Sequence, residues 1–270
     1  MSGAPQGFLG EAVGRSLKRA RILGEVLAGC EPPRERPGRL RRALLQQIDL
    51  HGGAVIVEYK RCSPSSGFIA YVDPHDYMIK TRGAAAAYSV LTEPHWFCGS
   101  MELIPVFAQE APVLMKDFVV SEEQVKAAAC MGAAGVLLIW DALPARRIEQ
   151  LARYAVNLGL DPVIEVKDAR SALQAAGLVP EAIIGVNSRD LATLRVDFAR
   201  MLEEVRRFRQ RYSGGDHIVV AESGVDTPEK ALTAFRSGAD AVLVGTAAMK
   251  DPGLPSAIIE LAREMLARRG

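Results

Sequence analysis

The sequence has little cysteine, few aromatic residues and almost no net charge, and each shortage excludes a class of protein. Its 270 residues include four cysteines, 6% aromatic residues and a formal net charge of +1. A general nucleic-acid binder usually carries a strong basic excess, so this charge argues against nucleic acid as a partner. No apolar run is long enough to span a bilayer and no signal-peptide core occurs, so we expect no membrane partner.

The cysteines and histidines are spread too widely along the chain to predict a metal site. No C-x-x-C pair and no Cys/His cluster occurs, which argues against zinc. The four histidines also form no ligand pattern. The cysteines are Cys30, Cys62, Cys98 and Cys130. We therefore expect a protein without a metal, located in a reducing cytoplasm.

Eight apolar, β-branched-rich runs divide the chain and predict its fold class. They begin near Ala54, Ala87, Pro112, Gly135, Pro162, Ala182, His217 and Asp240. Their hydrophobicity is continuous, which is typical of parallel strands buried on both faces. Between them lie helix start signals, a capping box at Ser121 and a Thr227-Pro228 cap. The pattern favours an α/β fold, a single (β/α)8 TIM barrel domain over residues 1–270. An open doubly wound sheet is the alternative, but no G-x-G-x-x-G follows the first strand.

The residues before the first strand predict an addition to this barrel. Residues from Phe8 to Ala28 have the pattern of an amphipathic helix, and a second helix is expected near Arg39 to Ile48. A proline-rich break separates the two. We interpret residues 1–52 as a helical extension packed on the barrel and not as a separate domain.

The first apolar run ends in an unusual pair of charges. Glu58 and Lys60 follow Ala54–Val57 with one residue between them, and residues two apart on a strand share a face. Charged side chains are rarely buried unless they are paired or functional. A structural ion pair that caps a core strand would explain this segment equally well.

Three later runs also end in polar side chains, and this repetition favours a functional site. Lys116, Glu165 and Asn187 each close an apolar run, in a chain where lysine is scarce beside arginine. Parallel strands of a barrel bring their carboxyl ends to one face, where such enzymes have their active sites. The sequence therefore predicts one site that contains these side chains together with Glu58 and Lys60.

The last two runs carry signals for phosphate binding. One ends in Glu222-Ser223-Gly224 and the other in Gly245-Thr246. In phosphate-binding barrels, the loops after strands seven and eight and a short helix hold the phosphate. Glycine lets backbone N–H groups approach the oxygens. The alternative is that Gly224 and Gly245 only permit tight turns.

Five segments together resemble the indole-3-glycerol-phosphate synthase family of tryptophan biosynthesis. Their residues are most similar to those of its archaeal or thermophilic members. The segments are Glu58–Ser65, Leu91–Phe97, Leu114–Val119, Gly185–Leu191 and Ala221–Gly224. They run from the first strand almost to the last. The resemblance implies a carboxy-lyase, which closes a ring in 1-(2-carboxyphenylamino)-1-deoxyribulose 5-phosphate with loss of carbon dioxide and water. It also implies that no metal or organic cofactor is needed.

The resemblance also implies roles for the polar strand ends. Lys116 matches the general acid at the substrate carbonyl, and Glu165 matches an acid/base group for the dehydration. Glu58 and Asn187 match groups that hold the developing hydroxyl and amine. Lys60 matches a residue placed against the substrate carboxylate. Which lysine donates which proton stays open.

The remaining expected contacts bind the two ends of the substrate. By resemblance, the phosphate grip contains Ser63, Gly224, Gly245 and Thr246, with Glu222 and Ser223 beside it. Arg189 matches a residue that braces the site. The apolar pocket matches Phe97, Phe118, Leu137 and Leu191, and Phe8 falls where some members have tryptophan. For Leu137 and Leu191, ordinary core packing is an equally good explanation.

Two other functions were weighed against this one. A phosphoribosylanthranilate isomerase needs a general acid/base pair, for which cysteine and aspartate at strand ends would be apt, and lysine and glutamate disfavour it. A catalytically silent barrel would have lost Lys116 or Glu165, and both are present. We expect a phosphorylated small molecule as the only ligand and a monomer. Association with other tryptophan-pathway enzymes is possible.

Overall fold

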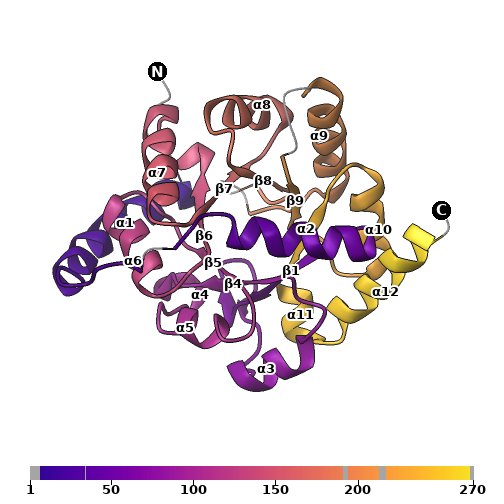
Figure 1. Ribbon diagram of the computed structural model, residues 1–270, viewed down its shortest axis with the longest axis horizontal. Helices are drawn as coiled ribbons and strands as arrows, with labels where there is room; N and C mark the ends of the chain where they lie inside the picture. The colour runs from indigo at the N-terminus through magenta and orange to yellow at the C-terminus, as the bar shows by residue number, and fades with distance from the viewer. Residues whose placement is uncertain (1–6, 34, 191–193, 213–216, 268–270) are drawn as a thin grey trace.

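Eight parallel strands close into a barrel in the computed structural model, which describes residues 7–33, 35–190, 194–212 and 217–267 (Figure 1). The strands are β1 (Ala54–Tyr59), β4 (Ala87–Leu91), β5 (Val113–Lys116), β6 (Gly135–Ile139), β7 (Asp161–Val166), β8 (Ile183–Asn187), β9 (Val219–Glu222) and β10 (Ala241–Val244). The barrel closes because β1 pairs with β10 on one side and with β4 on the other. The predicted barrel is confirmed, each strand begins within two residues of its predicted start, and the open sheet is wrong.

Helices surround the barrel and follow the strands along the chain (Figure 1). They are α3 (Pro74–Thr81), α4 (Pro94–Phe97), α5 (Leu103–Phe107), α6 (Glu122–Cys130), η1 (Trp140–Ala142), α7 (Ala145–Asn157), α8 (Ala169–Leu178), α9 (Phe198–Arg211), α10 (Pro228–Arg236), α11 (Thr246–Lys250) and α12 (Leu254–Ala267). The predicted cap at Thr227 is confirmed, since its hydroxyl accepts from the Lys230 N–H. The capping box at Ser121 is wrong, because its hydroxyl makes no cap hydrogen bond and Gln124 accepts instead from Val120 N–H.

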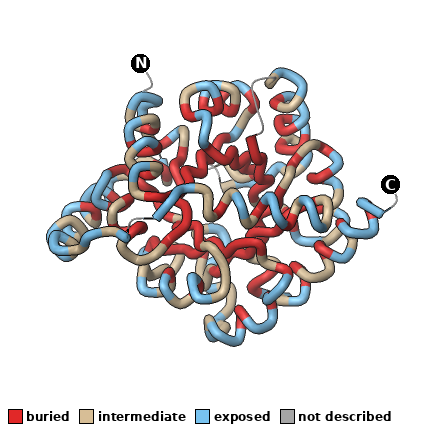
Figure 2. Tube along the Cα trace, viewed as in Figure 1, coloured by how far each residue is buried: buried red, intermediate tan, exposed pale blue. Residues whose placement is uncertain are grey.

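Two layers of apolar side chains form the core, and they explain the continuous hydrophobic runs. Buried residues concentrate on the strands and on the inner helix faces (Figure 2). On β1, Ala54 and Ile56 belong to the cluster inside the barrel, whereas Val55 and Val57 belong to the cluster under the helices. Because side chains alternate along a strand, the next inward residue is Glu58. The same alternation makes the last residues of several other strands face inward.

The extension consists of α1 (Gly7–Val26) and α2 (Arg39–His51), and both contact the barrel. Figure 1 shows α2 lying across the barrel, and Leu40 and Leu44 join the interior cluster there. The Asp161 carboxylate accepts from Leu40 N–H at 2.8 Å, which satisfies a free donor at the start of α2. Helix α1 packs against α6. The described part of the extension therefore lies against the barrel, and the division of the chain into one domain with an extension over residues 1–52 stays a prediction.

Two further strands, β2 (Cys62–Ser63) and β3 (Gly67–Phe68), form a short antiparallel hairpin directly after β1. The hairpin lies at the carboxyl end of the barrel strands, because it follows Tyr59 at the end of β1. The segment that reads Cys-Ser-Pro-Ser in the sequence is therefore a structured loop at the mouth of the barrel.

Candidate active site

A cavity of about 500 Å³ opens at the carboxyl ends of the strands. Every barrel strand contributes to its wall, namely through Glu58, Leu91, Lys116, Ile139, Glu165, Asn187, Glu222 and Leu243. The residues alternate with outward-facing side chains on each strand, as described for β1. The parallel topology thus brings these charged groups together at one end of the barrel, although some of them are more than a hundred residues apart in the sequence.

Lys116 lies between two carboxylates in this cavity. Its Nζ is 2.6 Å from Glu222 Oε2 and 3.2 Å from Glu165 Oε2. Burial lowers the pKa of Lys116, but the negative charges of Glu222, Glu165 and Glu58 outweigh burial and hold the pKa above its ordinary value. Lys116 is therefore protonated at neutral pH and can donate a proton.

Glu222 is buried, with 1% of its surface exposed. Burial raises the pKa of its carboxyl group to about 7, with Lys116 acting to lower it and Glu165 to raise it. Glu222 Oε1 has no hydrogen-bond partner among the described residues, and it lies where a Cβ on Gly185 would be. The cavity thus holds a carboxylate that titrates near neutral pH and has a free acceptor oxygen.

A second ion pair joins Lys60 and Glu58 at 2.6 Å. Gly245 packs against this pair, because a Cβ there would overlap Glu58 Oε1 and lie 3.1 Å from Lys60 Nζ. The missing side chain at Gly245 therefore makes room for a carboxylate, a use that the sequence did not indicate. Asn187 also lines the cavity, and its Oδ1 accepts from the Arg189 N–H at 2.9 Å.

A family model described as indole-3-glycerol phosphate synthase matches residues 31–261. The indole-3-glycerol phosphate synthase of Aeropyrum pernix is 52% identical over 252 residues, which cover 93% of this chain and 96% of that protein. The enzyme of the same name from Pyrobaculum aerophilum is 40% identical over 215 residues, which cover 80% of this chain and 84% of that protein.

The chain belongs to the indole-3-glycerol phosphate synthase family. The family prediction, its archaeal character and the predicted lyase activity are thereby confirmed. Solved structures at lower identity share the fold alone. Thiamine phosphate pyrophosphorylase from Pyrococcus furiosus has a TM-score of 0.59 at 19% identity and covers 82% of this chain and 99% of its own. A tryptophan synthase α-subunit mutant from the same organism has a TM-score of 0.56 at 13% identity, with 80% and 98% covered.

The apolar part of the cavity wall includes three of the predicted pocket residues, Phe97, Phe118 and Leu137. Phe8 does not line the cavity and instead packs behind Phe118, with ring centroids 5.8 Å apart. Helix α1 therefore supports the aromatic wall from outside. Leu191, the fourth predicted pocket residue, lies outside the described residues.

All but one of the residues predicted to hold the phosphate lie together in the cavity wall. Ser223, Gly224, Gly245 and Thr246 all line the cavity, and Arg189 lies with them. Ser63 is buried and does not line it. Its hydroxyl accepts from the Ser66 N–H at 3.2 Å, and Ser66 lines the cavity instead. The hairpin turn reverses the chain after Ser63, and the sequence did not reveal which serine of the loop faces inward.

Arg189 is half-buried between the cavity and the hairpin loop. Its Nη1 donates to Ser65 Oγ at 3.2 Å and to the Leu194 carbonyl at 2.9 Å. Burial lowers the pKa of Arg189, and the charge of Glu58 acts in the opposite direction. A guanidinium remains charged despite such a decrease, so Arg189 can both brace the loop and attract an anion.

Sequence reasoning missed several cavity residues, of which Asp117 is the most informative. Its carboxylate accepts from Thr92 Oγ1 at 2.7 Å and from Arg19 Nη1 at 3.0 Å. Asp117, the residue directly after Lys116, thus ties α1 to the end of β5. Its position beside a predicted catalytic lysine was the only available signal. The other missed polar lining residues are Glu93, Ser66, Asp226 and Lys250.

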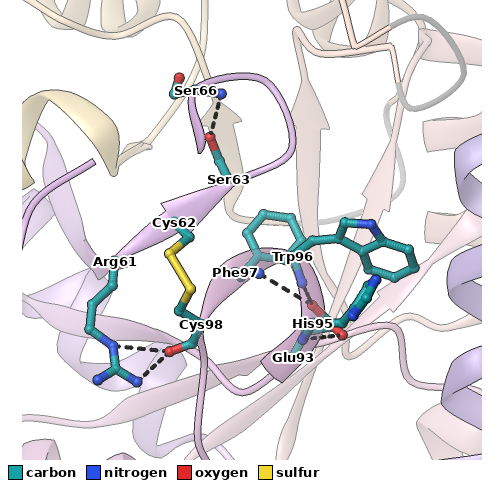
Figure 3. Close-up of a disulfide and its surroundings, with 9 residues drawn as sticks. All are labelled: Arg61, Cys62, Ser63, Ser66, Glu93, His95, Trp96, Phe97 and Cys98. Atoms are coloured by element: carbon teal, nitrogen blue, oxygen red, sulfur yellow. Dashed lines mark hydrogen bonds between the residues drawn. A yellow bond between two sulfur atoms is a disulfide. The ribbon is translucent and has the colours of Figure 1, made fainter. Parts of the chain in front are cut away.

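All four cysteines are paired in disulfides, which the sequence did not predict. Cys30 bonds to Cys130 and Cys62 bonds to Cys98. Figure 3 shows the second of these beside the hairpin and α4. The paired cysteines are 100 and 36 residues apart in the sequence, so no local spacing pattern indicated either bond. Among the described residues, no acidic, histidine or cysteine cluster could hold a metal ion, and no helix there is long and apolar enough to cross a membrane.

Proposed function

We propose that this cavity converts 1-(2-carboxyphenylamino)-1-deoxyribulose 5-phosphate into indole-3-glycerol phosphate, with Lys116 as the proton donor. The observation that carries this assignment is the position of Lys116 between Glu165 and Glu222 at the end of an apolar cavity wall. A protonated amine beside two carboxylates is held charged and in position until it donates its proton to a substrate oxygen. The family of the chain implies the reaction, and the geometry supports the roles proposed for these residues.

In the first stage, the Lys116 ammonium protonates the carbonyl oxygen of the substrate. The ring carbon that carries the carboxylate then attacks the carbonyl carbon and forms the new carbon–carbon bond. Loss of that carboxylate as carbon dioxide leaves its bonding electrons in the ring, which becomes aromatic again. Phe97 and Phe118 offer the flat apolar surface against which the ring can be held in this orientation.

In the second stage, the new hydroxyl group takes up a proton and leaves as water. The C–H bond of the adjacent ring carbon breaks, its electrons form the double bond of the indole, and its proton goes to a carboxylate. We assign this step to Glu165, which has 5% of its surface exposed and is already within 3.2 Å of Lys116. We assign Glu58 and Asn187 to the hydroxyl and the amine. We assign Lys60, which is paired with Glu58, to the substrate carboxylate. Glu222 tunes Lys116 and can accept a proton near neutral pH.

The phosphate of the substrate is assigned to the opposite side of the cavity. Ser223, Gly224 and Thr246 line this side, and Arg189 and Ser66 complete it. Because Ser66 replaces Ser63 as the inward serine, we assign the phosphate contact to Ser66 and give Ser63 the role of holding the turn. Lys250 also lines the cavity and adds positive charge near the anion.

We infer that the protein works in the cytoplasm as a monomer on this small phosphorylated substrate. The two disulfides are compatible with that location, because intracellular proteins of hyperthermophilic archaea are often rich in disulfides. Size-exclusion chromatography with light scattering would test the monomer. Association with other enzymes of the tryptophan pathway would appear as co-elution with them.

Turnover of the carboxyphenylamino substrate, followed by indole fluorescence in the presence of a chelator, tests the function. We expect indole fluorescence to increase at the same rate with and without the chelator. Loss of turnover with the chelator would contradict a metal-independent reaction. Absence of indole fluorescence from folded protein would contradict the function itself, and isomerisation of phosphoribosylanthranilate would favour the rival enzyme.

A further inference from the structure

Two loops at the mouth of the cavity are joined by the Cys62–Cys98 disulfide. Cys62 lies in β2 of the hairpin after β1, and Cys98 directly follows α4 after β4. Their Cα atoms are 5.5 Å apart. Figure 3 shows the bond between the hairpin, which carries Ser63 and Ser66, and α4, which carries Phe97. The bond therefore connects one loop of the phosphate side with one loop of the aromatic side.

The backbone at Cys98 supports a positioning role for this bond. Cys98 has φ 52°, in the left-handed region where helix ends usually place glycine. A residue with a side chain is strained in that region and persists there when its surroundings hold it. Here the hold comes from the disulfide and from Arg61, whose Nε donates to the Cys98 carbonyl at 3.0 Å. Neighbouring Gly99 packs against Leu91 with no room for a Cβ.

Each side of the link leads within a few residues to a wall of the cavity. From Cys62, the chain passes Ser63, whose hydroxyl fixes the turn that directs Ser66 into the cavity. From Cys98, the preceding residue is Phe97, whose ring lies 6.3 Å from that of Phe118. The start of α4 is held separately by Glu93, which accepts from the Trp96 N–H at 2.7 Å. The end of α4 depends on Cys98.

We propose that the Cys62–Cys98 disulfide is a positioning element for substrate binding, because it holds Ser66 and Phe97, on the loops after the neighbouring strands β1 and β4, at a fixed separation on the rim of the cavity. The proposal rests on the proposed function, since these residues are assigned to the phosphate and aromatic ends of one substrate. A flexible mouth must be ordered when substrate binds, and this ordering weakens affinity. The disulfide orders the mouth beforehand. It acts on KM more than on kcat, because it touches none of the proton-transfer groups.

The chain offers a matched control for this proposal. The Cys30–Cys130 disulfide joins the segment after α1 to the end of α6. Neither cysteine lines the cavity. Each disulfide can be removed by substituting its two cysteines with serine. Each can also be reduced by dithiothreitol, which leaves two protein thiols and a cyclic disulfide of the reagent. Cys62 and Cys98 also line a shallow outer hollow with Phe68 and Tyr71, so a reductant can reach them.

We expect Cys62→Ser/Cys98→Ser to raise KM for the carboxyphenylamino substrate roughly 3- to 30-fold, with kcat changed less than KM. Dithiothreitol should raise the KM of the natural protein to the same value and leave the KM of this variant unchanged. Cys30→Ser/Cys130→Ser should lower the unfolding midpoint while KM stays near that of the natural protein. Cys98→Gly, which removes the strain and the bond together, should raise KM like the double variant.

Hydrogen exchange and thiol counting test the proposal without turnover, so its failure is separable from that of the proposed function. Alkylation under non-reducing conditions should find no free thiol. Amide exchange in residues 61–69 and 95–99 should increase on reduction, and exchange in the barrel strands should not. Free thiols at Cys62 and Cys98 in the purified protein would overturn the proposal. An unchanged KM in the double variant, or the same rise in the control, would also overturn it.

Discussion

Lys116 and Lys60 occupy the same cavity, yet their surroundings differ in a way that separates their roles. Lys116 closes β5 and contacts two buried carboxylates, Glu165 and Glu222. Lys60 lies one residue beyond β1 and contacts one carboxylate, Glu58. The two side chains are similarly buried, at 14% and 13% exposed, so the difference lies in the number of carboxylate partners. Two partners hold Lys116 charged and in one position, which suits a proton donor. A single partner leaves Lys60 with fewer contacts to exchange for a substrate group, which suits charge recognition.

The largest expected effect in this comparison follows from removing the Lys116 ammonium. Lys116→Met keeps the length of the side chain but removes its proton, and kcat should decrease roughly 10²–10⁴-fold, or about 3–5 kcal/mol. Lys60→Met should mainly raise KM. Release of labelled carbon dioxide in a single turnover checks the assignment, since Lys116→Met should release almost none. Near-normal release from Lys116→Met would transfer the donor role to Lys60. Circular dichroism should show both variants folded.

A second large effect distinguishes the two carboxylates beside Lys116. Glu165→Gln should decrease kcat roughly 10²-fold, because it removes a group that acts after the carbon–carbon bond has formed. Labelled carbon dioxide should still be released in a single turnover, while indole fluorescence appears slowly. If carbon dioxide release slows as much as fluorescence, Glu165 acts in the first stage and the order of roles proposed here is wrong.

Two glycines allow the two ion pairs to be disturbed separately. A Cβ at Gly185 would overlap Glu222 Oε1, and a Cβ at Gly245 would overlap Glu58 Oε1. Overpacking of this kind typically costs about 1–3 kcal/mol. Gly185→Ala should therefore decrease kcat roughly tenfold through Lys116, whereas Gly245→Ala should act mainly on KM through Lys60. Equal effects of both variants on kcat and KM would contradict the separation of roles. Because Gly245 packs against Glu58 and Lys60, a raised KM in a Gly245 variant would not by itself prove phosphate contact.

The pH dependence of both the stability and the activity should be governed by Glu222. Its pKa is about 7 in the folded protein against an ordinary value of 4.5, so the folded state binds more protons than the unfolded state between these values. The free energy of unfolding should therefore decrease by about 2–3 kcal/mol as pH rises from 4.5 to 7. Glu222→Gln should abolish this decrease. Activity should rise through pH 7 as the carboxyl group ionises and can accept a proton, and the variant should lack that limb. Urea unfolding and a pH profile of kcat/KM measure the two effects.

A smaller effect concerns α1, which forms an ion pair with the residue directly after Lys116. Arg19 pairs with Asp117, and the Arg19 side chain is 24% exposed. Arg19→Met should lower the free energy of unfolding by about 2 kcal/mol, because it leaves the Asp117 charge with fewer partners. Arg21→Met on the same helix is the control, since that side chain is 88% exposed, and it should not move the unfolding midpoint. An equal loss in both variants would show that α1 contributes only general charge.

Eight continuous apolar runs separated by helix signals were enough to predict the barrel and the meeting of its polar strand ends at one face. Ala54, Ile56 and Glu58 show how such an end comes to face inward, because the residues that fill the barrel are followed two positions later by a residue that lines the cavity. Such patterns are local, and a closed barrel then brings every strand end to one face. The contacts made by Lys116 itself could not be predicted in the same way, because they depend on the exact register of β5, β7 and β9.

The sequence by itself determined the strands, their direction and the chemical groups at their ends, since these follow from hydrophobic periodicity and from residue type. The tertiary structure alone decided which groups meet. It paired Cys30 with Cys130 and Cys62 with Cys98, and it placed Ser66 in the cavity where Ser63 was expected. It also raised the pKa of Glu222 by burial. The reason is that disulfides, turn direction and desolvation depend on distances between segments far apart in the chain, and no local pattern encodes those distances.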